Sequence, residues 1–376
     1  MEHYLDNSAT TRVCPQAAEA ALRAMTELYG NPSSTHTPGR EAKKLLDASR
    51  AQAAKALGCK SEELVFTSCG SESDNWAILS GAEAMKRRGK HIISSQVEHD
   101  AVRKSLDELE SRGFEVTRLK PDGSGAIPAE AVKAALREDT VLVSLMLVNN
   151  ETGAVTDIPA VSRLLREAGS PALLHTDAVQ AFLKLPFSPK SLGADLISVS
   201  GHKIHAPKGI GALYIRSGLR LKPYILGGSQ ESGRRAGTEA MPQIAAFGAA
   251  CAVGLQQMPT AIERMAALKA QTVETLSAAI GDLGVIETAA PHILSISLPG
   301  YRSEVLMNFL EARQVYVSKS SACKKGGRSH VLEAMGLDAR TIDGAIRIGL
   351  SRETTREDID ALCQGLIEAH RTLRHS

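Results

Sequence analysis

The sequence has few aromatic residues and almost no net charge. Phenylalanine, tryptophan and tyrosine together make up 3% of its 376 residues, and the formal net charge is only +2. Proteins that bind nucleic acids usually carry a strong basic field and aromatic side chains on which bases stack. No apolar run approaches the roughly eighteen residues of a membrane-spanning helix. We therefore expect no direct contact with nucleic acid and no membrane association.

Cysteine is also sparse, and its spacing is irregular. No two of the six cysteines form a CxxC pair, which argues against structural zinc and thioredoxin-like chemistry, so we expect no metal. Residues 1–7 lack the basic start and the apolar core of a signal peptide. The simplest interpretation is a soluble, cytoplasmic protein with reduced thiols. The cysteines are Cys14, Cys59, Cys69, Cys251, Cys323 and Cys363.

The sequence does contain a regular alternation of helical and strand patterns, from about residue 16 to residue 255. Apolar runs of the strand type, such as 64–67 and 141–148, are separated by amphipathic segments of the helical type. This alternation is typical of an α/β fold, with a mostly parallel sheet covered by helices on both faces. The run 210–215 indicates an edge strand that a short connection reaches.

The pattern changes near residue 260. A long helix is predicted from there to about residue 280, followed by three strand candidates, intervening helices and a terminal helix from about residue 356. This order is typical of a smaller α+β domain. We therefore expect a large domain at residues 16–258 and a small domain formed by residues 1–15 and 259–376.

A lysine, Lys203, follows the apolar run 196–199, where a buried strand is expected to end. Ligand sites in α/β sheets gather at the carboxyl ends of strands. A lysine held there can lose its proton and form a Schiff base with a carbonyl group, although a solvated surface lysine is the alternative. Asp177 weakens that alternative because it ends a second apolar strand. A Schiff-base lysine and an aspartate that can pair with a pyridinium nitrogen are the protein side of a pyridoxal 5′-phosphate (PLP) site.

The segment around Gly70 joins a predicted strand to the start of a helix. Small residues there expose backbone N–H groups, and the helix dipole favours an anion, so Gly70 and Ser71 could hold a cofactor phosphate. Plain N-capping of the helix by Ser71 or Ser73 is the alternative. Ser200 and His202, just before the lysine, are further candidate phosphate donors.

Three other polar residues stand out by their positions. His99 lies between a strand and a helix, where it could stack on a flat ring or shuttle protons, or simply act as a cap or surface residue. Asn150 lies in a polar turn at the same sheet edge, and turn chemistry alone also explains it. Arg347 lies inside a predicted strand; its bidentate fork suits an α-carboxylate, and an ion pair is the alternative.

Cys323 lies in a polar, glycine-bearing loop, between Lys319 on one side and Lys324 and Lys325 on the other. Nearby ammonium groups favour the thiolate form of a cysteine. Cys323 is therefore the candidate nucleophile, and a chance surface cysteine is the alternative.

Taken together, these segments resemble the cysteine desulfurases, which are fold-type I PLP enzymes of the class V aminotransferase superfamily. The resemblance covers essentially the whole chain. It implies a large PLP-binding domain with a mostly parallel seven-stranded sheet, and a small domain that carries the catalytic cysteine loop. The matching segments are residues 4–11, 30–36, 66–75, 98–99, 149–153, 175–180, 200–211, 235–238 and 320–323.

The resemblance also implies a role for each matched residue. Lys203 bonds to the cofactor and moves the substrate α-proton, Asp177 keeps the pyridine nitrogen protonated, and Gln180 faces the ring hydroxyl. His99 stacks on the ring and assists proton transfer. Thr238 reaches the phosphate of a neighbouring subunit, which implies a homodimer. The other residues implied to bind the phosphate are Gly70, Ser71, Ser200 and His202.

The implied substrate is L-cysteine, whose carboxylate Asn150 and Arg347 would hold. Cys323 would attack the substrate sulfur and leave L-alanine and a persulfide on Cys323. The sulfur would then pass to an acceptor protein for iron–sulfur cluster assembly or tRNA thiolation. The alternatives are a selenocysteine lyase, another class V PLP enzyme, or a catalytically silent scaffold. Cys69 departs from the pattern because the family usually has glycine at this position of the phosphate turn.

Overall fold

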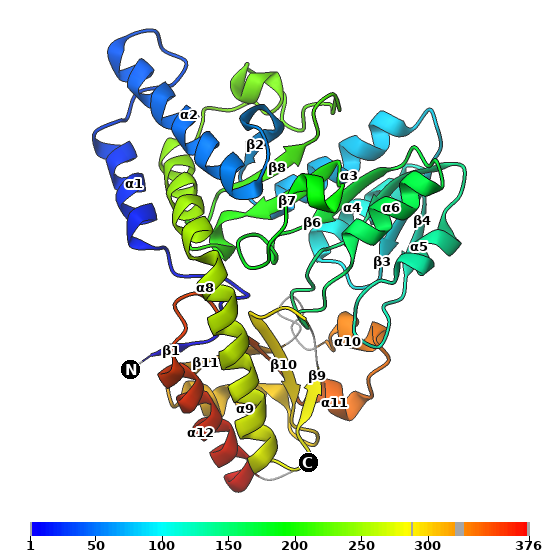
Figure 1. The fold of residues 1–376 in the computed structure, drawn as a ribbon, viewed down its shortest axis with the longest axis vertical. Coiled ribbons are helices and arrows are strands. Elements are labelled where there is room, and N and C mark those ends of the chain that lie inside the picture. The colour runs from blue at the N-terminus through cyan, green and yellow to red at the C-terminus, as the bar shows by residue number, and fades with distance from the viewer. Residues whose placement is uncertain (1, 287–288, 320–326, 374–376) are drawn as a thin grey trace.

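The computed structural model describes residues 2–286, 289–319 and 327–373, and one long helix runs through most of its length (Figure 1). This helix, α8 (Met241–Ala279), extends from a large sheet at one end of the molecule to a small sheet at the other. It packs against α1 (Pro15–Thr26) and α2 (Thr37–Leu57) near the large sheet, and against α12 (Arg356–Thr372) near the small one. The helix that we expected to begin near residue 260 therefore begins at Met241 and passes through the expected domain boundary.

In the described part of the chain, the large sheet has seven strands in the order β2-β8-β7-β6-β5-β3-β4. All neighbouring pairs from β7 to β4 are parallel, whereas β8 is antiparallel to both of its neighbours. The prediction of an α/β fold with a mostly parallel sheet is confirmed. The strands are β2 (Leu64–Thr67), β3 (His91–Ser95), β4 (Glu115–Leu119), β5 (Thr140–Ser144), β6 (Leu173–Asp177), β7 (Leu196–Ser200) and β8 (Gly211–Ile215).

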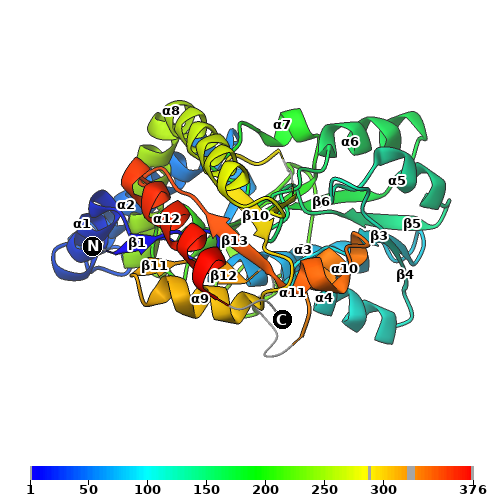
Figure 2. The same cartoon turned by 90° about the horizontal axis from the view of Figure 1, so that it is seen from below.

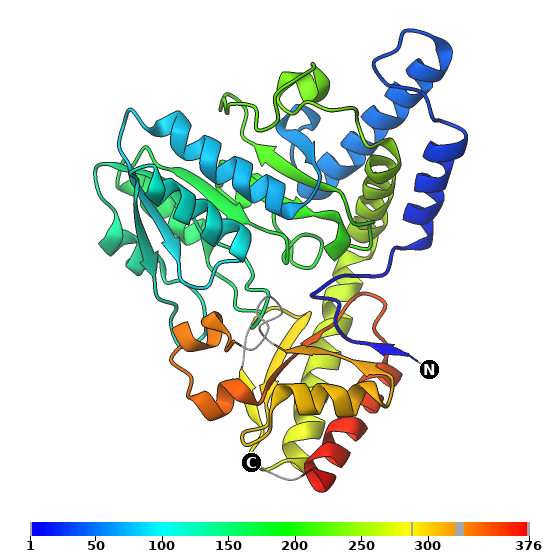
Figure 3. The same ribbon diagram turned by 180° about the vertical axis from the view of Figure 1, so that it is seen from behind.

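Helices cover both faces of this sheet. Helices α3 (Gly70–Met85) and α4 (Asp100–Ser111) pack against each other on one face (Figure 3). Helices α5 (Ala129–Ala135), α6 (Ile158–Glu167) and the short α7 (Pro189–Leu192) lie on the opposite face (Figure 2). Because both faces are covered, β3, β5, β6, β7 and β8 are buried along their whole length, which explains why the sequence shows apolar runs there.

The prediction that residues 210–215 form an edge strand is wrong. Strand β8 pairs with both β7 and β2, so β2 forms that edge of the sheet. The connection from Lys203 to Gly211 is too short for a crossover helix, so β8 returns antiparallel to β7. Strand β2, which comes much earlier in the chain, pairs with the free edge of β8. A pairing between such distant segments cannot be recognised from the local sequence pattern. The expected strand 141–148 also leaves the regular ladder after Ser144.

The small sheet is antiparallel and has the order β12-β13-β10-β9. Strand β1 (His3–Tyr4) pairs with β11 (Val315–Tyr316) beside it, so the N-terminal segment lies against the C-terminal third of the chain. The other elements here are β9 (Gly284–Ile286), β10 (Ile293–Ser297), α9 (Ser303–Glu311), β12 (Ser318–Lys319), α10 (His330–Ala334), α11 (Ala339–Asp343) and β13 (Ala345–Gly349).

The buried apolar side chains form one main core for each sheet, and the core of the large sheet also takes in Ile293 of β10 and Val331 of α10. The core of the large sheet includes Phe66, Ile197 and Phe247. The core of the small sheet includes Ile346 and also Leu5, from the other end of the chain. Burying these side chains is the main favourable contribution to folding, and it holds the N-terminal segment on the small sheet.

Candidate active site

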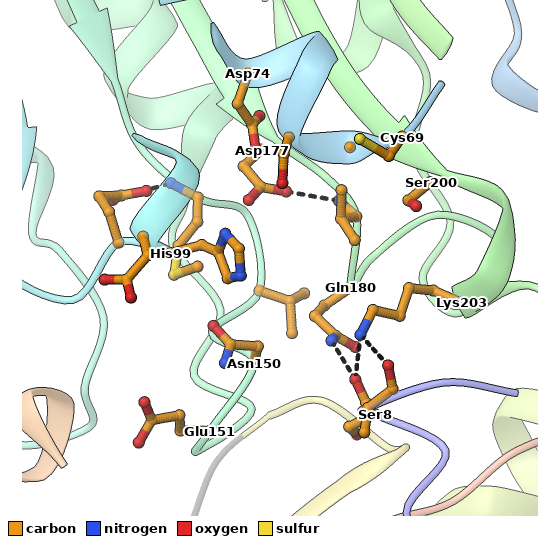
Figure 4. A pocket seen from close by; sticks show the side chains of 18 of the residues that line it. Ser8, Cys69, Asp74, His99, Asn150, Glu151, Asp177, Gln180, Ser200 and Lys203 are labelled. Atoms are coloured by element: carbon orange, nitrogen blue, oxygen red, sulfur yellow. Dashed lines mark hydrogen bonds between the residues drawn. The ribbon is translucent and has the colours of Figure 1, made fainter. Parts of the chain in front are cut away.

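A cavity of about 340 Å³ lies at the carboxyl ends of strands β6 and β7 (Figure 4). Separate parts of the chain enclose it, namely the turn at Ser8 and Ala9, the segments that follow the strands of the large sheet, His330 of α10 and Arg347 of the small sheet. The predicted site residues that line it are Gly70, Ser71, His99, Asn150, Asp177, Gln180, Ser200, His202, Lys203 and Arg347.

Lys203 lies in a short 3₁₀ turn, Gly201–Lys203, that follows β7 directly. Its Nζ donates hydrogen bonds to the carbonyl oxygens of Ser8 and Ala9, each at 2.6 Å (Figure 4). A side chain at Gly201 would lie 2.7 Å from Ile210 Cγ2, so glycine is required at the start of this turn. The amine therefore lies at the cavity, where it is hydrogen-bonded to the N-terminal segment.

Asp177 is the last residue of β6, and only 6% of it is exposed. Its Oδ1 accepts a hydrogen bond from the backbone N–H of Val179 at 2.9 Å. Burial raises the pKa of this carboxyl, while the nearby His99 and Lys203 and the Val179 N–H act in the opposite direction. Asp177 is thus a buried acid with the amine of Lys203 and the ring of His99 nearby.

Gln180 connects the two sides of the cavity. Its Nε2 donates to the carbonyl oxygen of Ser8 at 2.9 Å, so it shares that oxygen with Lys203. Its Oε1 accepts from Nζ of the buried Lys184 at 3.4 Å. Lys184 therefore fixes the amide so that its NH₂ group, and not its oxygen, is directed toward Ser8.

His99 is both a cavity residue and the N-cap of α4. Its Nδ1 accepts a hydrogen bond from the backbone N–H of Ala101 at 3.1 Å. Nδ1 must be unprotonated to accept this bond, so Nε2 is the nitrogen that carries or exchanges a proton. The sequence left open whether His99 is a cap or a site residue, and the geometry makes it both.

Gly70, Ser71, Ser200 and His202 surround one end of the cavity. A side chain on Gly70 would lie 2.8 Å from Val179 Cγ2 and 3.3 Å from Ser200 Cβ. Burial lowers the pKa of His202 to about 4, with Lys203 contributing, so the ring is neutral at pH 7. The capping alternative for Ser71 and Ser73 is wrong because α3 begins at Gly70, and Cys69 is its N-cap residue.

Asn150 and Arg347 meet across the two sheets. Arg347 is only 2% exposed, and its Nη1 donates to the carbonyl oxygen of Asn150 at 2.8 Å. Its Nη2 donates to Asp6 Oδ1 at 3.0 Å and to Ser318 Oγ at 2.7 Å. The ion pair that we held open as an alternative for Arg347 is therefore present. The side chain of Asn149, whose Oδ1 accepts from the backbone N–H groups of Glu151 and Thr152, shapes the turn that presents Asn150.

One predicted residue, Thr238, is not among the described residues that line the cavity. Thr238 is exposed and lies elsewhere on the surface of the chain. Cys323 lies outside the described residues, as do Lys324 and Lys325.

Four acidic residues that line the cavity were not predicted from the sequence: Asp74, Glu98, Asp100 and Glu151. Glu98 is buried, which raises its pKa to about 8, and its Oε1 accepts from Ser95 Oγ at 2.5 Å. Burial also raises the pKa of Glu151 to about 7, although Ser329 donates a hydrogen bond to it. Asp74 lies one helical turn after Gly70 on α3. The sequence did contain a signal for Asp74: it lies four residues after Gly70, and residues four apart lie on the same face of a helix.

The residues present fit the parts of PLP. Ser200 Oγ is buried at the Gly70 end of the cavity and has no hydrogen-bond partner among the described residues, which suits a phosphate oxygen. The amine of Lys203 suits the aldehyde, and the buried carboxyl of Asp177 suits the pyridine nitrogen. The described residues contain no group of three or more His, Cys, Asp or Glu side chains that could hold a metal ion.

Comparison with known proteins agrees with this chemistry. The family model named aminotransferase class-V matches residues 3–362, so the chain belongs to this family of PLP-dependent enzymes. Within it, the cysteine desulfurase of Trichormus azollae is 42% identical over 376 residues, covering 99% of this chain and 93% of that protein.

Solved structures show the same relationship. A NifS-like protein superposes with a TM-score of 0.93 at 37% identity, covering 99% of this chain and all of that one. A structure described as SspA in complex with cysteine has a TM-score of 0.81 at 32% identity and covers 94% of this chain. Among the described helices, none has both the length and the apolar character needed to cross a membrane.

Proposed function

We propose that this protein is a PLP-dependent cysteine desulfurase that removes sulfur from L-cysteine and leaves L-alanine. The observation that carries the proposal is the convergence of Lys203, Asp177 and His99 on one cavity, in a chain that is 42% identical to a cysteine desulfurase. Bound PLP would supply an electron sink for the charge left when the substrate loses its α-proton. The remaining steps depend on the side chains of the chain itself.

Lys203 and Asp177 would hold the two ends of the cofactor ring system. The Lys203 amine would bond to the aldehyde carbon, and afterwards it would move the substrate α-proton. The carboxylate of Asp177 would pair with the protonated pyridine nitrogen, while the NH₂ group of Gln180 would face the ring hydroxyl. Gly70, Ser71, Ser200 and His202 would surround the phosphate.

His99 would stack on the ring and assist proton transfer. Because the N–H of Ala101 occupies Nδ1, the exchanged proton belongs to Nε2. Asn150 and Arg347 would bind the substrate carboxylate, and Arg347 is already held in place by Asp6 and Ser318. Asn150 follows the large sheet and Arg347 belongs to the small sheet, so a bound substrate would contact both sheets.

Cys323 would act as the sulfur acceptor. Its thiolate forms a bond to the substrate sulfur while the carbon–sulfur bond of the substrate breaks, and the electron pair of that bond remains on the carbon skeleton. Proton uptake by that skeleton gives L-alanine, and Cys323 is left as a persulfide. The sulfur would then pass to an acceptor protein for iron–sulfur cluster assembly or tRNA thiolation.

We also propose a homodimer. Helix α1 exposes Leu22 and Met25, and Tyr29 follows in the loop after this helix; their exposed fractions are 58%, 56% and 72%. Leu226, at 82% exposed, lies on the loop that leads to Thr238. A second copy covering these apolar side chains would bury them, and it would allow Thr238 to reach the phosphate of the neighbouring site.

The two main cores support a division into a large domain of residues 16–258 and a small domain of residues 1–15 and 259–376. Leu5 packs in the core of the small sheet, as this division requires. Helix α8 crosses the boundary and would act as a rigid connection between the two domains. We place the protein in the cytoplasm, where its thiols would stay reduced.

Mass spectrometry after incubation with L-cysteine tests the proposed function directly. We expect one added sulfur atom on Cys323 and one L-alanine for each sulfide released under reducing conditions. Cys323→Ala should lose the persulfide and sulfide release but retain the absorbance of bound PLP. If Cys323→Ala still releases sulfide, a lyase without a persulfide is the better description. If only selenocysteine is turned over, the protein is a selenocysteine lyase.

A further inference from the structure

The cavity contains a second buried carboxyl group beside the one assigned to the pyridine nitrogen. Asp74 is 1% exposed and Asp177 is 6% exposed, and both line the cavity (Figure 4). They come from different layers, because Asp74 lies on α3 and Asp177 ends β6. Two carboxylates buried together in this way repel each other strongly, so one of them retains its proton at neutral pH.

The surroundings of the two groups differ in charge. Asp177 has His99 and Lys203 nearby and accepts a hydrogen bond from the Val179 N–H, all of which favour its ionised form. Burial and the acidic neighbour Asp177 raise the pKa of Asp74 well above its usual range, with Glu98 and Cys69 adding to this, and they outweigh the opposing hydrogen bond with Ser198. Asp177 is therefore the member of the pair that can ionise.

The groups that contact Asp74 are neutral. The Ser198 hydroxyl lies close to its carboxyl group, and His175 Nε2 lies 3.6 Å from Asp74 Oδ1. His175 is fully buried, which lowers its pKa to about 3, so it carries no charge at neutral pH. Its two nitrogens are hydrogen-bonded to Ser144 Oγ at 2.8 Å and Ser198 Oγ at 3.0 Å. Among the described residues, Asp74 Oδ1 has no hydrogen-bond partner, which suits a carboxylic acid better than a carboxylate.

We infer that Asp74 is a positioning residue that carries the single proton of an Asp74–Asp177 pair. It thereby keeps the Asp177 carboxylate available for a cationic partner without adding a second negative charge to the cavity. This inference rests on the proposed role of Asp177 toward the pyridine nitrogen. The neutral chain from Ser144 through His175 and Ser198 holds Asp74 in place across the sheet.

Infrared spectroscopy of the protein, with PLP bound and after its removal, tests the protonation of Asp74 directly. We expect a carbonyl band of a buried carboxylic acid at pH 7 that disappears in Asp74→Asn. Glu98→Gln is the matched control, because it should remove a different band from a second buried acid in the same cavity. If Asp74→Asn removes no such band, Asp74 is ionised and the inference fails.

The dissociation constant and the absorbance spectrum of PLP test how the proton on Asp74 affects cofactor binding. Asparagine keeps the shape and neutrality of a protonated aspartate, so Asp74→Asn should change the dissociation constant of PLP by less than about threefold and the midpoint of its absorbance titration by less than about half a pH unit. Asp74→Leu removes the polar group and should raise the dissociation constant by about tenfold or more, because the buried Asp177 carboxylate would then lie beside an apolar side chain.

The outcomes separate the inference from the proposed function. If Asp74→Asn shifts the absorbance midpoint by more than about one pH unit, a tenfold change in the equilibrium, a charge has been removed and the inference is overturned. If the infrared band behaves as expected but Asp177→Asn leaves PLP affinity and the spectrum unchanged, the assigned role of Asp177 is wrong while the protonation of Asp74 stands.

Discussion

Arg347 Nη2 and Asp6 Oδ1 lie 3.0 Å apart, and this ion pair joins the N-terminal segment to the central strand β13 of the small sheet at the edge of the cavity. The guanidinium side chain is 3% exposed, so the pair is largely shielded from water. Asp6 thus presents Arg347 to the cavity in a single orientation. Such an arrangement suits the binding of a substrate carboxylate by a planar, bidentate donor.

Arg347→Lys should weaken substrate binding more than it slows turnover. A lysine retains the charge but cannot form the forked contact, and it also loses several of the hydrogen bonds to Asn150, Asp6 and Ser318. We expect KM for L-cysteine to rise by roughly ten- to hundredfold, as loss of a charged hydrogen bond of about 1.5–3 kcal/mol implies. Steady-state kinetics check this. Arg313→Lys, at an exposed ion pair with Glu368, is the control and should leave KM unchanged.

Gly70→Ala should weaken PLP binding. The added methyl group would lie 2.8 Å from Val179 Cγ2, between that side chain and Ser200, so the cradle at the start of α3 must shift. Overpacking of this kind costs about 1–3 kcal/mol, and we expect a dissociation constant for PLP that is roughly tenfold higher. Gly123→Ala is the matched control because nothing lies within 4 Å of its added methyl group. Equal affinity in the two variants would contradict the placement of the phosphate.

Glu98 should make the protein less stable as the pH rises. Burial raises its pKa from 4.5 to about 8, so the folded state retains a proton that the unfolded chain has lost. Between these two values the folded state binds more protons, and the free energy of unfolding therefore falls with increasing pH. Glu98→Gln cannot titrate and should flatten this dependence by up to about 1.4 kcal/mol per pH unit.

Urea unfolding of both proteins from pH 5 to pH 8 measures this difference. The slope against pH is the informative quantity, because any packing cost of the glutamine amide is the same at every pH. The exposed Glu138→Gln serves as the control and should reproduce the wild-type slope. A wild-type slope in Glu98→Gln would mean that Glu98 is ionised in the folded protein.

Replacing Leu22, Met25 and Tyr29 with serine should convert the proposed dimer to monomers. Leu22 and Met25 lie on α1 and Tyr29 follows the end of this helix; all three side chains are more than half exposed in the single chain. Light scattering coupled to gel filtration would report the change in mass. Leu226→Ser tests the second exposed apolar site in the same way. A wild-type protein that is monomeric at micromolar concentration would refute the proposal at once.

The predictions that held were those that depended on local patterns. Lys203 and Asp177 follow apolar runs, and the carboxyl ends of neighbouring parallel strands must meet at one sheet edge. The same argument placed His99 and Asn150 near them. The alternation of helices and strands was enough to predict the α/β fold, because two covered faces require apolar strands.

The errors arose where distant segments pair. Residues 210–215 have the same apolar pattern whether they form an edge strand or, as observed, lie between β7 and β2. Helix α8 continues through Pro259, although the sequence pattern changes near residue 260. Asp74 was overlooked because a single aspartate on a helix is usually solvated, and only the packing of α3 on the sheet buries it.

The sequence by itself determined which elements form and which strand ends carry a lysine, an aspartate and a histidine, because hydrophobic periodicity and chain direction are local properties. Only the tertiary structure decided that Ser8 meets Lys203, that Arg347 reaches Asn150 and that Asp74 lies beside Asp177. These contacts join residues far apart in the chain, and the resulting burial determines which of the carboxyl groups keep their protons.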